Sequence, residues 1–349
     1  MQGYFTLSST LTLLLPFLAW LGVMIPPHSH AETPAPEMTL SLVGPGNLSF
    51  LPFDLIPRIG ADRAEGTTIR LKHTDGGTAA LDQLLSRNSD FAAVGLTALM
   101  MAAKAGAPPP AIAIAPVADI PLFVLIVRQA LRDQIKGVAD LRGRTIGVPS
   151  RSANIRTAAE QLVVSLLRAH GLETEDARII PIGQGRKGRA ILLENGEIDA
   201  IMAEEPFASA MIASGVAFSL VSLADEAPAS TIPGSRFLHV TLATRPDTIA
   251  GEPTKIERMV RILRRSLTWI ATHTPEEIVA HLPIPTPDEQ NLFMLCLRQY
   301  PRMFSRNALF DAHQLRETER FFRHANPERA PIQADGLIDP RWTAGRVSH

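Results

Sequence analysis

The sequence predicts an α/β protein with two lobes, each a mainly parallel sheet flanked by helices. The chain has 349 residues, and a chain of this length is usually too long to fold around a single small hydrophobic core. Segments of strand and helix character alternate along it, which is the order that builds parallel sheets. The alternation begins again at Thr145, so we expect a second sheet.

The first group of elements predicts lobe one. Two segments alternate with the period of a strand, and three short apolar runs of strand length follow them. Apolar residues at helical spacing separate these strands, and Gly106 closes one of the helices. The predicted strands are 38–43, 67–73, 90–94, 111–115 and 122–127, and the predicted helices are 50–59, 79–87 and 96–105.

The second group predicts lobe two, and the rest of the chain is largely helical. The predicted strands are 145–148, 178–182, 198–203, 217–223 and 237–243; helices are predicted at 155–170 and 189–194, with another opened by Pro206. Further helices are predicted within 253–273, 287–300 and 309–325. We expect lobe one to comprise 38–123 and 239–349, lobe two 124–238, and the extended segments 122–127 and 237–243 to act as the hinge.

The N-terminus predicts export. Residues 11–25 are uncharged and apolar, but Pro16 interrupts this run and it is shorter than the roughly 20 residues of a membrane-spanning helix. Small residues Ser29 and Ala31 follow, so we expect a signal peptide over 1–31 and a periplasmic mature protein. Because Met1 to Thr10 contains no Lys or Arg, an uncleaved anchor or a buried helix is the alternative.

Composition excludes several classes of protein. The net charge of −1 gives no reason to expect a nucleic-acid partner. The single cysteine, Cys296, excludes an internal disulfide and sits in an apolar stretch typical of a buried side chain. No HExxH pattern or nucleophile elbow occurs, so we expect no metal, no cofactor and no catalysis. Residues 183–188 match G-x-G-x-x-G, but Arg186 and Lys187 at its centre do not fit a dinucleotide site.

Residues 140–207 carry a series of short motifs in a fixed order. They are Asp140-Leu141-Arg142-Gly143, a serine loop at 150–152, the segment 196–200, and Glu205-Pro206; residues 84–94 add a counterpart in lobe one. Together they resemble the type 2 periplasmic solute-binding proteins of ABC importers, in the branch that binds alkanesulfonates, nitrate and thiamine precursors. The resemblance covers most of 38–245 and implies a two-strand hinge with a ligand cleft between the lobes.

Candidate ligand-binding residues lie in the loops that follow strands. In open parallel sheets, ligands bind outside the carboxyl ends of the strands, near helix N-termini that favour anions. The resemblance implies the same loops. The candidates are Gly46, Asn47, Leu48, Thr74, Gly76, Gly77, Gly95 and Thr97 in lobe one, and Ser150, Ser152, Ala153, Asn154, Gln184 and Glu205 in lobe two.

Some of these candidates have simpler interpretations. The serines of 150–154 can cap the following helix with or without holding an anion, and Asn47 can belong to a plain Gly-Pro-Gly-Asn turn. Glu204 and Glu205 can be a solvated pair or attract a cation. Phe50 and Phe123 can line the cleft or belong to the core.

The sequence therefore predicts an exported, monomeric solute-binding protein. We expect it to capture a small anionic molecule between its lobes and to deliver it to the permease of an ABC importer. Two alternatives stay open: an enzyme of pyrimidine or quinone precursor synthesis on the same fold, which export argues against, and a periplasmic sensor subunit.

Overall fold

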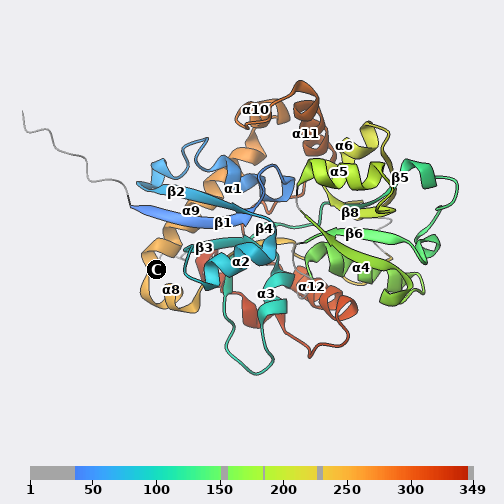
Figure 1. Cartoon of the computed structure of the whole chain (residues 1–349). Helices are drawn as coiled ribbons and strands as arrows, with labels where there is room; N and C mark the ends of the chain where they lie inside the picture. Colours follow the sequence, from blue (N-terminus) through green and yellow to red (C-terminus); the bar gives the residue numbers. More distant parts are fainter. Residues whose placement is uncertain (1–35, 151–155, 184, 226–230, 345–349) are drawn as a thin grey trace, which may run out of the picture. The chain divides into compact units, whose positions relative to one another are not determined.

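Two five-stranded sheets organise the part of the chain that the computed structural model describes, residues 36–150, 156–183, 185–225 and 231–344 (Figure 1). The predicted signal peptide lies outside these residues, and none of the helices within them is long and apolar enough to cross a membrane. In each sheet four strands run in one direction and one runs against them. The predicted α/β fold with two mainly parallel sheets is confirmed.

The first sheet has the order β2-β1-β3-β10-β4 and the second has the order β7-β6-β8-β5-β9. The strands of the first sheet are β1 (Glu37–Val43), β2 (Thr68–Thr74), β3 (Phe91–Val94), β4 (Ile112–Ala118) and β10 (Val240–Thr244). Those of the second are β5 (Phe123–Arg128), β6 (Thr145–Pro149), β7 (Arg178–Ile182), β8 (Ala200–Glu204) and β9 (Ala217–Ser222).

Helices cover both faces of each sheet. The first sheet packs against α1 (Leu51–Leu55) and α9 (Pro253–Thr272) on one face, and against α2 (Gly77–Leu85) and α3 (Leu96–Ala102) on the other. The second sheet packs against α4 (Ala158–Ala169) on one face, and against α5 (Arg186–Glu194) and α6 (Phe207–Ala213) on the other. The remaining helices are α8 (Pro246–Gly251), α10 (Pro275–Ala280), α11 (Pro287–Gln299) and α12 (Ala312–Ala325).

The two connections between the sheets join their carboxyl edges. The antiparallel strand β5 begins at Phe123 opposite Glu204, the last residue of β8. Likewise β10 begins beside the ends of β3 and β4, with Val240 opposite Ala118. The chain passes into the second sheet through β5 and returns to the first sheet through β10, both antiparallel to their neighbours, so the described residues of the two connections, 119–122 in one and 223–225 and 231–239 in the other, adjoin the edges where the parallel strands end.

Two parts of the chain differ from the prediction, the segments expected to cross between the lobes and the helix α10. Most of 122–127 and 237–243, which we expected to cross between the lobes, lies within the sheets as β5 and β10. Both strands are buried on both faces, and such strands are apolar throughout, so their sequence does not distinguish a paired strand from a connection. The short helix α10 was not predicted; Thr274 caps it and Pro275 begins it.

Helix α12 contacts the cores of both sheets. Its Phe321 stacks on Phe237 with ring centroids 4.1 Å apart and belongs to the core of the second sheet. The neighbouring Phe322 lies in the core beneath α2 and α3 of the first sheet. Figure 1 shows α12 between α3 and α4, so this helix fastens the second connection to both halves of the molecule.

We predict that Gly234→Ala destabilises the protein by roughly 3 kcal/mol, measured by urea unfolding. Gly234 has φ +73°, and a Cβ there would lie 2.2 Å from the Glu317 carbonyl oxygen and 2.4 Å from the Phe321 nitrogen of α12. A left-handed conformation and a backbone clash each cost about 1–3 kcal/mol. The control is Gly188→Ala in α5, where the Cβ meets nothing and stability should rise slightly. Equal stabilities of the two variants would contradict the packing described for 231–239.

Candidate functional site

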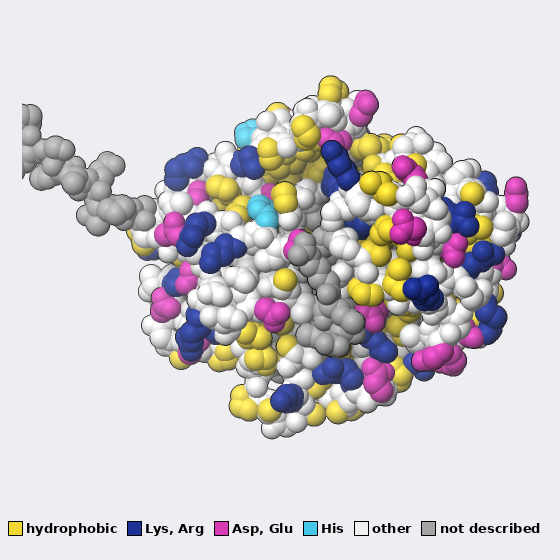
Figure 2. Space-filling view, in the orientation of Figure 1, with side chains coloured by type: hydrophobic (Ala, Val, Ile, Leu, Met, Phe, Trp, Pro, Cys, Tyr) yellow, Lys and Arg dark blue, Asp and Glu magenta, His cyan; other side chains and the backbone are white. Residues whose placement is uncertain are grey.

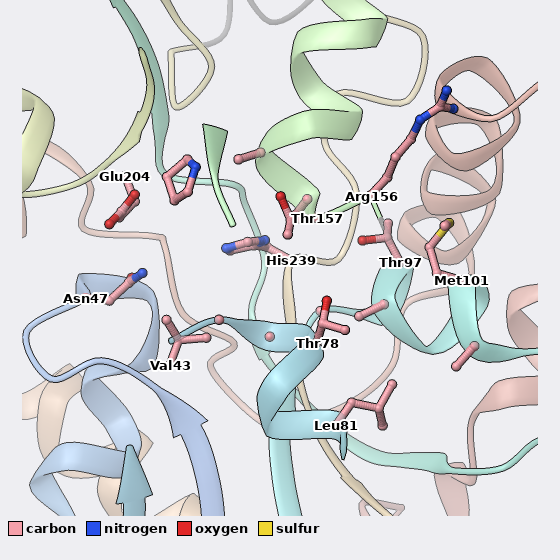
Figure 3. A pocket seen from close by; sticks show the side chains of 18 of the residues that line it. Val43, Asn47, Thr78, Leu81, Thr97, Met101, Arg156, Thr157, Glu204 and His239 are labelled. Carbon is pink, nitrogen blue, oxygen red and sulfur yellow. The ribbon is translucent and has the colours of Figure 1, made fainter. Parts of the chain in front are cut away.

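A cavity of about 180 Å³ lies between the carboxyl edges of the two sheets (Figure 3). Its lining comes from the loops after β1, β2 and β3, from the start of α4, from the end of β8, from the first residue of β5, from the residue before β10, and from Arg329 after α12. The walls are mostly apolar, with threonine, asparagine and histidine side chains placed among them. Such a mixture is typical of a site that binds a small molecule.

The first sheet contributes loops that glycines keep close to the cavity. Gly95 follows β3, and a Cβ there would lie 3.0 Å from the His239 carbonyl oxygen, so glycine lets this loop approach the second connection. Asn47 accepts a hydrogen bond from the Ser49 backbone through its side-chain oxygen, which leaves its amide nitrogen turned toward the cavity in Figure 3. Gly77 begins α2, whose first backbone N–H groups face the same space.

The second sheet contributes the start of α4. Thr157 caps this helix by accepting a hydrogen bond from the Glu160 N–H, and its side chain lines the cavity. Arg156 beside it donates to the carboxylate of Glu328 at 2.8 Å and to the Ala325 carbonyl at the end of α12. Arg156 thus has partners outside the cavity, and its guanidinium fastens α4 to the C-terminal segment.

A buried ion pair stands at the end of β8. Both oxygens of Glu204 accept hydrogen bonds from Arg189, at 2.8 and 3.0 Å, and Arg189 lies 4.2 Å from the ring centre of Phe207. Burial alone would raise the pKa of Glu204, but the charge and hydrogen bonds of Arg189 outweigh it and hold the pKa below its usual value. Glu204 therefore meets the cavity as a carboxylate whose charge is already neutralised.

The first residue of β5 and the residue before β10 meet at the cavity. Phe123, the first residue of β5, contacts His239, the residue before β10, with ring centroids 5.3 Å apart and planes nearly perpendicular. The His239 backbone N–H donates to the Ala118 carbonyl at 3.0 Å. Burial lowers the pKa of His239 to about 4, so the imidazole is neutral at pH 7.

Five of the predicted site residues line this cavity: Asn47, Gly76, Gly77, Gly95 and Thr97. Two more, Gly46 and Thr74, line an adjoining cavity of about 290 Å³, into which Arg186 of α5 reaches to donate a hydrogen bond to the Gly46 carbonyl at 2.7 Å. This hydrogen bond joins the two halves of the molecule at the edge of the site.

The other predicted residues lie elsewhere. Leu48 is fully buried in an apolar cluster with α1 and α11, and Ser150 is buried at the end of β6, where its backbone N–H donates to Ile182. Glu205 points away from the cavity and accepts a hydrogen bond from the Ser209 backbone N–H near Cys296. Ser152, Ala153, Asn154 and Gln184 lie outside the described residues.

Sequence reasoning did not single out several residues that line the cavity. Glu204 was paired with Glu205 as an alternative, but neighbouring residues of a strand face opposite sides, and the pattern did not show which one faces the ligand space. His239 was taken as part of a strand, with no separate role. Thr157 was missed because the helix start was placed two residues earlier, although a threonine before an apolar helix with Glu160 three residues later is a capping signal.

No group of three or more potential metal ligands occurs within the described residues. The cavity brings together the amide of Asn47 and the hydroxyl of Thr97, which were predicted, with the hydroxyl of Thr157 and the imidazole of His239, which were not, among apolar walls. This arrangement suits reversible binding of a small molecule through hydrogen bonds.

Comparison with protein families gives one match. The sequence model of the family described as NMT1/THI5 like matches residues 63–278, more than half of the chain. The matched part includes every strand of the two sheets except β1, and the whole of α9. No curated protein sequence matches the chain.

Solved structures share the fold at low sequence identity. A protein from Bordetella bronchiseptica RB50 has a TM-score of 0.77 and 20% identity over 88% of this chain and 95% of its own. The alkanesulfonate-binding protein SsuA from Xanthomonas axonopodis pv. citri, bound to MOPS, has a TM-score of 0.68 and 15% identity over 88% and 98%. The periplasmic nitrate-binding protein NrtA from Synechocystis PCC 6803 has a TM-score of 0.57 and 13% identity over 73% and 68%. The periplasmic binding protein fold is therefore confirmed.

We predict that Arg189→Met destabilises the protein by about 3–5 kcal/mol at pH 7, because it leaves Glu204 buried without a partner. The wild-type pair stabilises the fold above the unfolded pKa of glutamate, about 4.3, and this stabilisation is lost as pH falls through the lowered folded pKa. In the variant, burial instead raises the pKa of Glu204. The destabilisation should therefore shrink as pH falls and this carboxylate protonates.

Urea unfolding between pH 4 and 8 measures this difference. The matched control is Arg320→Met, which removes the exposed pair with Glu317 and should change stability by less than about 1 kcal/mol. The double variant Arg189→Met with Glu204→Met should recover part of the loss. A single Arg189 variant as stable as the control would contradict the role given to the pair.

Proposed function

Because the chain belongs to the NMT1/THI5-like family, we propose that it is a periplasmic solute-binding protein that captures a small anionic molecule and delivers it to the permease of an ABC importer. The observation that carries the proposal is the cavity lined jointly by the carboxyl-edge loops of both sheets. In open parallel sheets this is the edge at which ligands bind.

The polar groups of the cavity favour an anion that brings its own acceptor oxygens. Helices α2 and α4 begin at the cavity and direct N–H groups and partial positive charge toward it. Thr78, Thr97 and Thr157 add hydroxyl donors. Two proteins of the same fold carry names that agree with such a ligand, one an alkanesulfonate-binding protein bound to MOPS and one a nitrate-binding protein.

Two lobes that close on the ligand complete the proposal. Lobe one comprises 38–123 and 239–349, and lobe two comprises 124–238, with the hinge in the two connections, whose described residues are 119–122, 223–225 and 231–239. A ligand that contacts both sides favours the closed form, because only there can it make both sets of contacts. The mature protein, released from its signal peptide after Ala31, acts as a monomer and presents the closed form to the permease.

Isothermal titration calorimetry with a panel of anions tests this function. The panel contains MOPS, 1-butanesulfonate, nitrate and benzoate, with choline as a cationic comparison. We expect at least one anion to bind with a stoichiometry of one and choline to give no heat. Heat from choline alone, or from none of the compounds, would contradict a site for small anions.

The variant Thr97→Val separates this cavity from binding elsewhere. It removes one hydroxyl from the cavity and keeps the side-chain volume, so the dissociation constant should increase about 3- to 10-fold, since one hydrogen bond is worth about 0.5–1.5 kcal/mol. The control Thr68→Val changes an exposed residue of β2 and should bind like the wild type. Equal affinities for the two variants would place the binding site elsewhere.

A further inference from the structure

His239 occupies a position that its surroundings hold in one orientation. It is the last residue of the second connection, and it is 6% exposed. Phe123 packs edge-on against its ring from the start of β5, and Phe237 does the same with ring centroids 6.0 Å apart. Figure 3 shows the imidazole in the middle of the cavity, between Asn47 and Glu204 on one side and Thr97 and Thr157 on the other.

The imidazole has no hydrogen-bond partner among the described residues. Its Nδ1 is fully buried and unpartnered, and neither ring nitrogen is in a side-chain hydrogen bond. Buried polar groups in folded proteins nearly always have a partner, because burial without one costs about 1–3 kcal/mol. The ring thus lines the cavity as a rigid polar group, and Nε2, which is not among the fully buried atoms without a partner, is the nitrogen that a molecule in the cavity can reach.

The charged groups around the ring have partners of their own or lie at the rim. Glu204 at the end of β8 is bound by Arg189, and Arg156 before α4 is bound by Glu328. Arg329, after α12, donates to the Met101 carbonyl of α3, and Asp82 of α2 is exposed. Because burial keeps the imidazole neutral, it carries one N–H. A buried N–H without a partner is the less favourable arrangement, so the proton belongs on Nε2, and the buried Nδ1 keeps its lone pair.

We propose that His239 determines ligand specificity by donating a hydrogen bond from Nε2–H to an oxygen of the bound molecule, such as a carboxylate, sulfonate or carbonyl oxygen. This inference rests on the proposed function and adds which residue recognises the ligand. The ring provides a directed donor with no net charge, so it favours a molecule that places an acceptor at the base of the cavity. Because His239 ends the connection between the lobes, the same hydrogen bond ties the ligand to the segment that moves on closure.

The test replaces the imidazole and keeps its packing. His239→Phe preserves the aromatic contacts with Phe123 and Phe237 but removes the donor, and His239→Gln keeps a donor of similar reach. We expect the anion that binds most tightly among MOPS, 1-butanesulfonate, nitrate and benzoate to bind about tenfold more weakly to the phenylalanine variant, and the glutamine variant to recover part of the affinity. The control His313→Phe changes an exposed histidine of α12 and should bind like the wild type.

The pH dependence of anion affinity provides a second test, because a purely structural role of His239 would not produce it. An anion beside the ring raises the pKa of His239 above about 4, so the ring protonates at a higher pH in the complex than in the free protein. Affinity should stay constant while the ring is neutral in both states, increase by at most tenfold per unit as pH falls through the pKa of the complex, and level off near pH 4. The increase should be absent in His239→Phe, while any contribution from Glu204 or Asp82 would persist there. The Nε2 resonance of His239 in ¹⁵N-histidine NMR should also shift when the anion binds.

Failure of this inference is distinguishable from failure of the proposed function. An anion that binds wild type and His239→Phe with equal dissociation constants and the same pH dependence would overturn the role of His239 and leave the binding function standing. If no anion of the panel binds to the wild type at all, both the proposed function and this inference are wrong.

Discussion

The site depends on one topological constraint: in the part of the chain that the structure describes, both connections between the two sheets begin and end at carboxyl edges. The chain passes into the second sheet through β5 and returns to the first sheet through β10, in each case the strand that runs against the others. The edges where the parallel strands end are therefore held face to face. The loops after those strands and the N-termini of the helices that follow them therefore lie around one cavity.

This constraint also decides the chemistry of the cavity. A buried carboxylate at the end of β8 would repel an anion, but Arg189 neutralises it. Arg156 of the second half is bound by Glu328 of the C-terminal segment, and Arg329 donates to the Met101 carbonyl of α3, so both guanidinium groups have partners outside the cavity. What is left for a ligand is a set of neutral donors, namely threonine hydroxyls, backbone N–H groups and the imidazole of His239, together with the exposed carboxyl group of Asp82 on α2. Selection by directed hydrogen bonds follows from this set.

Much of the fold was predictable from the sequence, because burial and pairing leave local patterns. Alternation and apolar runs located the strands. The glycines and the threonine after β2 and β3 identified part of the lining that the first sheet contributes to the cavity. Contacts between residues far apart in the chain were not predictable. Nothing near residue 239 signals that Phe123 will meet it, and nothing in α5 signals that Arg189 will pair with Glu204. Leu48 was misplaced because the adjacent Asn47 faces the cavity while the backbone turns Leu48 into the core.

The central claim is that one small molecule is gripped by both lobes at once. Spin labels at Ser86→Cys, at the end of α2, and Ser214→Cys, after α6, report the distance between the lobes, while the buried Cys296 stays unlabelled. Double electron–electron resonance should show a narrower distance distribution with a shifted maximum when a saturating concentration of an anion that binds by calorimetry is added. As a control, the Thr97→Val variant should show no change at an anion concentration that is too low for this variant to bind the anion. An identical distribution with and without the saturating anion would contradict the claim.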